Sequence, residues 1–421
     1  MLLTNFDLIR QKFDNLNIDK SHFVNSNDIC TPMDCVKEMV DSIPENFWQQ
    51  SNLKILDSCC GNGNFFAYIA LKTPLSNLYF NEINPKRIAN VYDYFGKNIN
   101  LTTQDFLTFN EIYSNENDKF DLVVSNPPYA KFNNSNDKRV SKNHNLSRDF
   151  IFKALQITKK GGYILFVVPN NWMSFSDRNI LPKLLSNYQF LYLDIGGAKK
   201  YFKNVGSSFT WFLLQKIDNT KPFLVNNNYV FKNDLQSVIL DKNSSFIPLY
   251  YSEIVRSILN KTINNKSLPK YNIQTSSNLH KTTKKQYLSN VKNDEFKYKI
   301  IHTPTQTIYS KQAHIYQNGY KVFLSLTNQF QVFIDNCGMT QSIAFIRCEN
   351  KAQAEQIKTE LEQPIYKFLN NITRYGNFNN VRVLQNFPKW NSFELTPQEN
   401  DFINNFNQQY YKNHQAKKLK T

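Results

Sequence analysis

The sequence lacks the marks of a secreted, membrane-spanning or zinc-binding chain. Its six cysteines form neither a CxxC pair nor a Cys/His set with zinc spacing; they are Cys30, Cys35, Cys59, Cys60, Cys337 and Cys348. Its longest apolar run, Tyr163 to Pro169, is far shorter than the roughly 20 residues that cross a bilayer. Charged residues such as Asp7 and Arg10 stand where a signal peptide has an apolar core. We therefore expect a cytoplasmic protein with reduced thiols, no metal site and no membrane contact.

Length and charge indicate two domains with different roles. The 421 residues exceed the roughly 250 to 300 at which a single hydrophobic core stops growing. The net charge of +16 is uneven: residues 1–219 carry 24 Lys and Arg against 21 Asp and Glu, whereas residues 220–421 carry 26 against 13. A basic half beside a nearly neutral half is typical of a polyanion-binding module joined to a catalytic domain. A charge bias that serves only solubility is the alternative.

The first half alternates short apolar runs with helical stretches, which predicts an α/β domain built on a parallel sheet. The expected strands are 53–57, 78–80, 120–125, 163–168, 190–194 and 208–214. We place the domain boundary near residues 218–245, which gives a first domain of residues 1–218 and a second of residues 245–421. Polar, Asn-rich turns follow Leu214, and alternating strands are expected around residues 320–323 and 332–334.

Polar residues end successive units of this α/β pattern. Asp57, Glu82, Asp105 and Asn126 follow one another at spacings of 25, 23 and 21 residues. Each step is about one strand-helix unit long, so these side chains should line up along the carboxyl edge of one sheet, where α/β proteins bind ligands.

Three of these positions suit a nucleoside ligand. Asp57 opens a tight loop with Gly61 and Gly63, whose small residues let a ligand approach the backbone. The second-strand acid Glu82 suits the two hydroxyls of a ribose. Asp105-Phe106 offers an acceptor for an amino group beside an aromatic face for a purine ring. The loop lacks the GxGxxG spacing of dinucleotide enzymes, which excludes that class.

The segment Ser125-Asn126-Pro127-Pro128-Tyr129 carries the chemistry. Two prolines remove two N–H donors, so the amide oxygen of Asn126 and the carbonyl of Pro127 dominate the polar surface. Two converging acceptors fit one planar NH2 group and localise the lone pair of its nitrogen, which can then attack a methyl sulfonium held in line. Tyr129 would stack on the ring and favour its developing positive charge.

In this order the motifs resemble the gamma class of adenine-N6 DNA methyltransferases of type II restriction-modification systems, over roughly residues 22–215. In that class the catalytic motifs come first and a target-recognition domain follows. The resemblance implies a Rossmann-like sheet that binds S-adenosyl-L-methionine, followed by a mixed α/β domain that binds DNA. It also implies double-stranded DNA as substrate and a cognate restriction endonuclease as a partner.

The resemblance assigns roles residue by residue. Thr31-Pro32, which we also expect to cap and start a helix, resembles the motif that holds the methionine part of the cofactor. Ser58-Cys59-Cys60 stands where Pro-Ala-Cys is usual in the glycine loop, and keeps small residues. The implied cofactor-binding residues are Thr31, Asp57, Cys59, Gly61, Glu82, Ile83, Asp105, Phe106, Asn126 and Phe150, and the implied catalytic residues are Asn126, Pro127, Pro128 and Tyr129.

The target base would be held by two aromatic residues. Residues 201–205 resemble the loop whose aromatic side chain packs on the base opposite Tyr129, and this role falls to Phe202. An adenine inside a duplex cannot reach such a pocket, so the mechanism includes rotating the nucleotide out of the stack.

Other functions stay open at this point. Enzymes that methylate glutamine in release factors share the NPPY tetrapeptide, but they place a helical domain before the glycine loop and little after the catalytic strand. RNA adenine methylation would need the same chemistry and a similar charge. An inactive nucleic-acid-binding subunit would show damage to the tetrapeptide or to the acids, and the sequence shows none.

The second half contains no readable groove-binding motif. Candidates for contact with phosphate or bases are Lys281, Lys284, Lys285, His302, Lys311, His314, Arg374 and Arg382. Residues 369–380 mix a cation, aromatics and amides and resemble the recognition region of some restriction-associated adenine methyltransferases, with a polar surface turn as the alternative.

Overall fold

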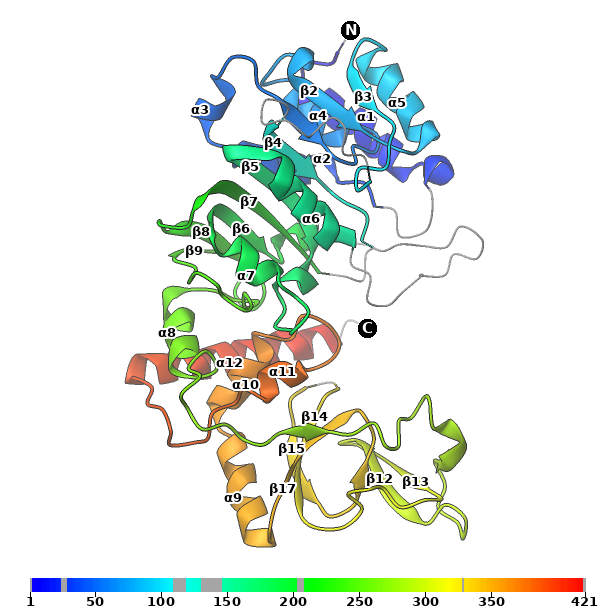
Figure 1. The fold of residues 1–421 in the computed structure, drawn as a ribbon, viewed down its shortest axis with the longest axis vertical. Coiled ribbons are helices and arrows are strands. Elements are labelled where there is room, and N and C mark those ends of the chain that lie inside the picture. The colour runs from blue at the N-terminus through cyan, green and yellow to red at the C-terminus, as the bar shows by residue number, and fades with distance from the viewer. Residues whose placement is uncertain are drawn as a thin grey trace. The chain divides into compact units, whose positions relative to one another are not determined.

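The computed structural model describes residues 2–23, 29–108, 119–129, 146–202, 208–327 and 329–418. The chain divides into two compact units (Figure 1). The first comprises Met1–Trp172 and Ile180–Ser245, and the second comprises Met173–Asn179 and Phe246–Thr421. Among the described residues, no helix combines the length and apolarity that a bilayer crossing requires.

The first unit is built on one nine-stranded sheet with the order β3-β2-β1-β4-β5-β7-β6-β8-β9. Its strands are β1 (Ile55–Asp57), β2 (Leu78–Asn81), β3 (Asn100–Thr102), β4 (Phe120–Ser125), β5 (Thr158–Pro169), β6 (Tyr188–Ile195), β7 (Phe209–Asp218), β8 (Phe223–Asn227) and β9 (Asp234–Val238). All six strands expected from the apolar runs are present. β1 lies between β2 and β4, so the strand order reverses at β1.

The expectation of a wholly parallel sheet is wrong. β3, β2, β1, β4 and β5 are parallel, but β7 runs antiparallel between β5 and β6, and β9 is antiparallel to β8. An apolar run predicts a strand but does not show whether that strand is parallel or antiparallel to its neighbours. The direction of β7 depends on which strands it pairs with in the folded sheet.

Three strands were not anticipated from the sequence. β3 has three residues, none of them buried, and so leaves little pattern. β8 and β9 form an antiparallel pair where Asn-rich turns were expected, and exposed or half-buried residues alternate with buried ones along β8. The edge strands β3 and β9 bury too little apolar surface to stand out from a loop.

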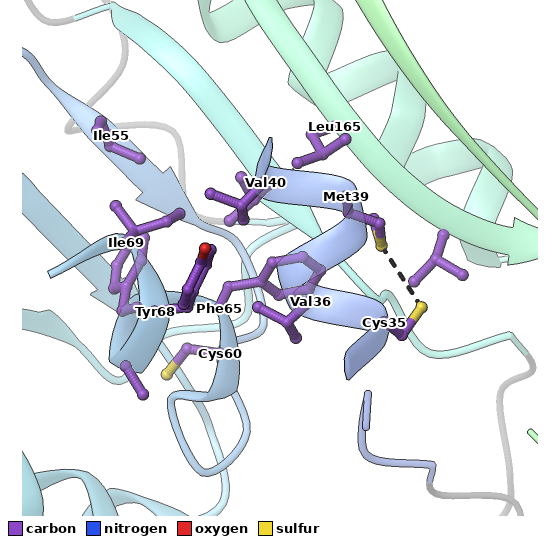
Figure 2. Close-up of a cluster of buried hydrophobic side chains, with 14 of the residues drawn as sticks. Cys35, Val36, Met39, Val40, Ile55, Cys60, Phe65, Tyr68, Ile69 and Leu165 are labelled. Carbon is purple, nitrogen blue, oxygen red and sulfur yellow. Dashed lines mark hydrogen bonds between the residues drawn. The ribbon is translucent and has the colours of Figure 1, made fainter. Parts of the chain in front are cut away.

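Helices complete the first unit. They are α1 (Phe6–Ile18), α2 (Met33–Asp41), α3 (Glu45–Trp48), α4 (Asn64–Ile69), α5 (Pro85–Phe95), α6 (Leu146–Ile157) and α7 (Leu181–Leu185). The helices α1, α2 and α4 pack together, and α6 packs along β5. Figure 2 shows how apolar side chains of α2 meet those of α4 and the sheet, among them Val36, Val40, Phe65, Ile69, Ile55 and Leu165.

The start of α2 differs from the expectation that Thr31 caps it. Pro32 is the N-cap residue, and its side chain makes no capping hydrogen bond, although its carbonyl accepts from Cys35 N and Val36 N. The hydroxyl of Thr31 instead accepts a hydrogen bond from Asn126 Nδ2 at 2.9 Å. Thr31 is therefore tied to the strand edge and not to its own helix.

The second unit contains two four-stranded sheets and a group of helices. The sheets have the orders β10-β17-β14-β15 and β11-β13-β12-β16. The strands are β10 (Gln274–Thr275), β11 (Leu288–Ser289), β12 (Tyr298–Thr303), β13 (Gln306–Ser310), β14 (Lys321–Ser325), β15 (Val332–Asp335), β16 (Gly338–Met339) and β17 (Ile343–Arg347). The helices are α8 (Glu253–Lys261), α9 (Lys351–Leu361), α10 (Pro364–Asn371), α11 (Val381–Leu384) and α12 (Pro397–Lys418). The two strands expected near residues 320 and 332 are present as β14 and β15.

Candidate active site

The four polar residues that end successive units lie at one edge of the first sheet. Asp57 is the last residue of β1, Glu82 follows β2, Asp105 comes three residues after β3, and Asn126 follows β4. These strands are parallel, so their carboxyl ends meet at the same edge, and the order reverses there at β1. Such a reversal opens a crevice outside the strand ends, which is where α/β sheets bind ligands.

The glycine loop after β1 depends on its two glycines. Gly61 and Gly63 have φ angles of +56° and +90°, a region that residues with a Cβ rarely adopt. A Cβ on Gly63 would also lie 2.6 Å from Cε2 of Phe95. The loop can therefore turn sharply from β1 into α4 only with these residues.

Asp57 carries an acceptor atom whose hydrogen bonding is incomplete. The side chain is 1% exposed, and its Oδ1 accepts from Cys59 N at 3.3 Å. Its Oδ2 is buried and finds no partner among the described residues. Burial, opposed by that backbone hydrogen bond and reinforced by Glu82, raises the pKa of the Asp57 carboxyl well above its usual range. A buried unsatisfied acceptor costs about 1–3 kcal/mol, so this atom suits a donor brought by a ligand.

Glu82 links the second strand to the glycine loop. Its Oε2 accepts from Gly61 N at 2.8 Å, and its Oε1 accepts from Asn84 N at 2.8 Å. These two bonds fix the carboxylate beside the glycine loop. The neighbouring Ile83 side chain is 62% exposed.

Aromatic rings gather beyond the third strand. Phe106 is buried and stacks on Phe150, with 5.2 Å between ring centroids and 25° between planes. Asp105 is exposed, and its Oδ1 accepts from Leu107 N at 3.0 Å. The structure thus brings together two predicted cofactor residues, Phe106 and Phe150, that lie 44 positions apart in the sequence.

Two hydrogen bonds from its amide nitrogen orient the side chain of Asn126. Nδ2 donates to Ile29 O at 3.0 Å and to Thr31 Oγ1 at 2.9 Å. With both N–H groups engaged, the amide oxygen points the other way, and it accepts a hydrogen bond from the hydroxyl of Tyr129. The prolines between them differ, since Pro127 is buried and Pro128 is exposed.

The small polar residues of the glycine loop join it to the end of β4. Ser58 Oγ and Ser125 Oγ are 2.8 Å apart, and Cys59 Sγ donates to Asn126 O at 3.3 Å. Burial raises the pKa of the Cys59 thiol well above its usual range, so the thiol keeps the proton that it donates. The departure from Pro-Ala-Cys therefore adds hydrogen bonds between the glycine loop and the tetrapeptide.

Phe202 and Tyr129 belong to one aromatic group. Phe202 is buried and stacks on Phe209 with 4.6 Å between ring centroids. Phe209 in turn lies 5.5 Å from the ring of Tyr129, at an interplanar angle of 52°. Residues 203–205 of the predicted base-binding loop, and Asn145 of the stretch before Phe150, lie outside the described residues.

The loop that leads to Phe202 is anchored by Asp194 at the end of β6. Asp194 Oδ2 accepts from Ala198 N at 2.8 Å, and Oδ1 accepts from Asn226 Nδ2 at 3.0 Å. A Cβ on Gly197 would lie 2.3 Å from Oδ1, so the turn fits closely around the carboxyl. Burial raises the pKa of Asp194 to about 7.

Three residues near the site were missed in the sequence. Arg87 of α5 is 8% exposed, and its Nη1 lies 3.4 Å from where a Cβ on Gly61 would stand. Lys153 of α6 is 7% exposed, with Nζ 5.1 Å from the ring centroid of Phe106, and burial lowers its pKa. Phe209 is the third. Arg87 lies only five positions after Glu82, a predicted cofactor-binding residue. This closeness in sequence is the signal that could have pointed to Arg87.

The residues of the second unit that are candidates for contact with phosphate or bases differ in burial and in their ion pairs. His314 is 3% exposed, with Nε2 2.9 Å from Ser276 Oγ, and this burial disfavours it among the candidates for contact with phosphate or bases. Lys311 pairs with Glu295 at 3.3 Å, and Arg382 pairs with Asp177. In residues 369–380, Asn370 and Asn379 are buried and bonded to each other, which favours the structural turn over a recognition element.

No group of three or more His, Cys, Asp and Glu residues in the described ranges has the geometry of a metal site.

Residues 48–202 match the Eco57I restriction-modification methylase family. Modification methylase CviBIII of Paramecium bursaria Chlorella virus NC1A is 26% identical over 165 residues, which are 38% of this chain and 42% of the relative. Type II methyltransferase M.HincII of Haemophilus influenzae is 24% identical over 256 residues, 56% of this chain and 47% of the relative. The matched part thus spans about half the length of these curated relatives.

Two solved structures resemble nearly the whole chain. The DrdV-DNA complex superposes with a TM-score of 0.55 at 10% identity, covering 96% of this chain and 59% of that one. A nuclease-deletion mutant of the Type ISP restriction-modification enzyme LlaGI, in complex with a DNA substrate mimic, gives 0.54 at 14% identity, covering 94% and 56%. The predicted fold class is confirmed: a Rossmann-like methyltransferase sheet is followed by a mixed α/β domain. Residues 48–202 are therefore similar in sequence to restriction-modification methylases, and the chain shares its fold with restriction-modification enzymes.

Proposed function

We propose that this protein is a site-specific DNA methyltransferase that transfers a methyl group from S-adenosyl-L-methionine to N6 of an adenine rotated out of the duplex. The observation that carries the proposal is the fixed amide of Asn126. Its nitrogen is held by Ile29 and Thr31, so its oxygen is presented as an acceptor beside the carboxyl end of β1.

The residues around the glycine loop fit the cofactor. The free oxygen of Asp57 suits the ammonium group of the methionyl part, and Glu82, already fixed by two backbone N–H groups, suits the ribose hydroxyls. Ile83 and the Phe106–Phe150 pair supply apolar surface for the adenine ring of the cofactor. When bound, S-adenosyl-L-methionine supplies an electrophilic methyl group attached to a sulfonium.

Asn126 and Pro127 prepare the nitrogen that attacks. The Asn126 amide oxygen and the Pro127 carbonyl each accept one hydrogen of the adenine NH2 group, which draws its lone pair out of the ring. With the cofactor bound, this nitrogen would take the methyl group as the C–S bond of the sulfonium breaks, and it would release its extra proton to solvent. The Asn126 oxygen already accepts a hydrogen bond from the Tyr129 hydroxyl, and its second lone pair is the one that suits the adenine NH2 group.

An extrahelical base needs two flat surfaces, and the aromatic group can supply them. The Tyr129 hydroxyl contacts the Asn126 oxygen, and the Tyr129 ring contacts Phe209, on which Phe202 stacks. Stacking of a base on an aromatic ring is worth about 1–3 kcal/mol, which offsets much of the cost of unstacking it from the duplex.

Duplex DNA is the polymer that the second unit suits. Its sequence is rich in lysine, and the solved structures that resemble the chain include DNA complexes. The restriction-modification relatives also make a cognate endonuclease an expected partner. Methylation of RNA or of a release-factor glutamine would use the same acceptors, so the substrate must be tested directly.

The test is transfer of a tritiated methyl group with duplex DNA, RNA and release factor offered separately. We expect label in DNA, at N6 of adenine after nuclease digestion. Label on RNA or protein would replace the DNA assignment, and label on none of the three would remove the enzymatic function. Sequencing the modified bases in DNA from cells that express the protein would then give the target sequence.

A further inference from the structure

Five polar side chains from three separate segments meet on the second unit. We name them the Lys281 cluster; they are Lys281, His302, Gln306, Thr340 and Gln341. Lys281 lies in the loop before β11, His302 and Gln306 flank the turn between β12 and β13, and Thr340 and Gln341 follow β16. Figure 1 labels the β12–β13 hairpin that carries two of them.

Hydrogen bonds and strand pairing hold the Lys281 cluster in place. Lys281 donates its backbone N–H to Gln341 Oε1 at 2.9 Å and its Nζ–H to Gln306 Oε1 at 3.4 Å. His302 Nδ1 lies 2.8 Å from Thr340 Oγ1. The register supports this, because Ile301 pairs with Met339 and Thr303 pairs with Gln306.

Several N–H donors of the Lys281 cluster are not used by these hydrogen bonds. Both glutamine oxygens are turned toward Lys281, so their NH2 groups point away from it, and the ammonium of Lys281 has two further N–H groups. Lys281, Gln306 and Gln341 are all half-buried, so the cluster lies at the surface with its side chains restrained. A restrained surface of donors suits a partner that presents acceptors.

The surroundings of the Lys281 cluster suit a nucleic acid. Residues 274–348 contain nine Lys and Arg against three Asp and Glu, whereas residues 349–421 contain ten against seven. Lys284 and Lys285, next to the cluster, are exposed. Contacts from such lysines to phosphates position a protein on DNA, and groups between them can then reach the base edges.

Resting on the function proposed above, we propose that the Lys281 cluster reads the major-groove edge of a guanine in the DNA target. Guanine presents two acceptors there, O6 and N7, and a lysine or other donors can bind both. Adenine presents an acceptor and an N6–H donor, and a glutamine reads it only by accepting from N6. Here both glutamine oxygens already accept from Lys281, so guanine is the better match.

The experiment is selection of bound sequences from a randomised duplex pool, with the full chain and with Lys281→Met. We expect the wild type to select a guanine at one or more positions. We expect Lys281→Met to lose that preference about 10- to 100-fold at one position, and Lys281→Arg to keep it. At the same position, 7-deazaguanine, which lacks N7, should weaken binding, whereas inosine, which keeps O6 and N7, should not.

The matched control is Lys292→Met, which removes an exposed lysine of the same region outside the cluster. It should weaken binding about equally for all sequences and leave the selected sequence unchanged. An unchanged selection with Lys281→Met, or a wild type that binds no duplex DNA or prefers duplex RNA, would overturn the inference. A wild type that selects guanine but transfers no methyl group would leave the inference standing and remove the proposed function.

Discussion

The strand edge of the first unit and the Lys281 cluster of the second unit place polar groups in two different ways. At the strand edge, Asp57, Glu82 and Asn126 lie at the ends of parallel strands, and backbone N–H groups or a neighbouring hydroxyl fix their side chains. In the Lys281 cluster the groups come from loops and from the facing ends of β12 and β13, and the backbone N–H and the side chain of Lys281 each donate one hydrogen bond within it. Groups fixed at the ends of parallel strands suit a constant cofactor and reaction, whereas groups on loops and hairpin turns can change to read another sequence.

The largest effect should come from Asn126→Ala. Removing the oriented acceptor should lower the rate of methyl transfer about 10²- to 10³-fold, as loss of one preorganised hydrogen-bonding group does in other enzymes. Cofactor affinity, measured by calorimetry, should fall much less, because Asp57 and Glu82 remain. A variant with the wild-type transfer rate would show that Asn126 takes no part in methyl transfer.

Asp57→Asn should weaken cofactor binding and stabilise the ligand-free protein. Without the negative charge, affinity for S-adenosyl-L-methionine should fall about 10- to 100-fold, since hydrogen bonds to charged groups contribute about 1.5–3 kcal/mol. The ligand-free protein should melt at a higher temperature, because burial raises the pKa of Asp57 and the amide removes the cost of a buried charge. Equal cofactor affinity in variant and wild type would show that Asp57 serves only the fold.

Asp194 should make the first unit sensitive to pH. Its pKa is about 7 in the folded protein, whereas an ordinary aspartate titrates at 3.8, so between these pH values the folded state holds a proton that the unfolded state has released. The free energy of unfolding should therefore fall as pH rises from about 4 to 7. Asp194→Asn should remove this dependence and stabilise the protein at pH 8 by about 1–3 kcal/mol, measured by urea unfolding. A parallel fall in both proteins would assign the dependence to other groups.

The smallest effect should come from replacing Lys284 and Lys285 with methionine. Each lost phosphate contact should reduce the salt dependence of DNA binding by about one unit in the log-log slope and weaken binding similarly for all sequences. Cofactor affinity should stay at the wild-type value, since these exposed lysines belong to the second unit. A change in cofactor affinity would contradict the division of roles between the units.

The sequence was most informative for the candidate site residues that lie at the ends of strands. Asp57, Glu82 and Asn126 could be placed because each follows a readable apolar strand at a spacing of about one strand-helix unit. The direction of β7, and with it the contact of Phe209 with Tyr129, could not be placed, since an apolar run does not reveal its neighbours.

The sequence also could not predict which basic side chains are buried or which residues form the Lys281 cluster. Arg87 and Lys153 sit on helices at positions that read as ordinary charged residues, and only the packing shows that they are buried. His314 was a candidate for contact with phosphate or bases, yet the fold buries it against Ser276. The Lys281 cluster joins residues up to 60 positions apart, and no local pattern marks such a meeting.

The hydrogen bond from the Tyr129 hydroxyl to the Asn126 oxygen uses one of the two lone pairs of that oxygen. The amide is thus held by three hydrogen bonds, two from its nitrogen and one to its oxygen. Under the proposed function, an incoming NH2 group would meet an acceptor that is already in position, so the amide would need no reordering when the base arrives.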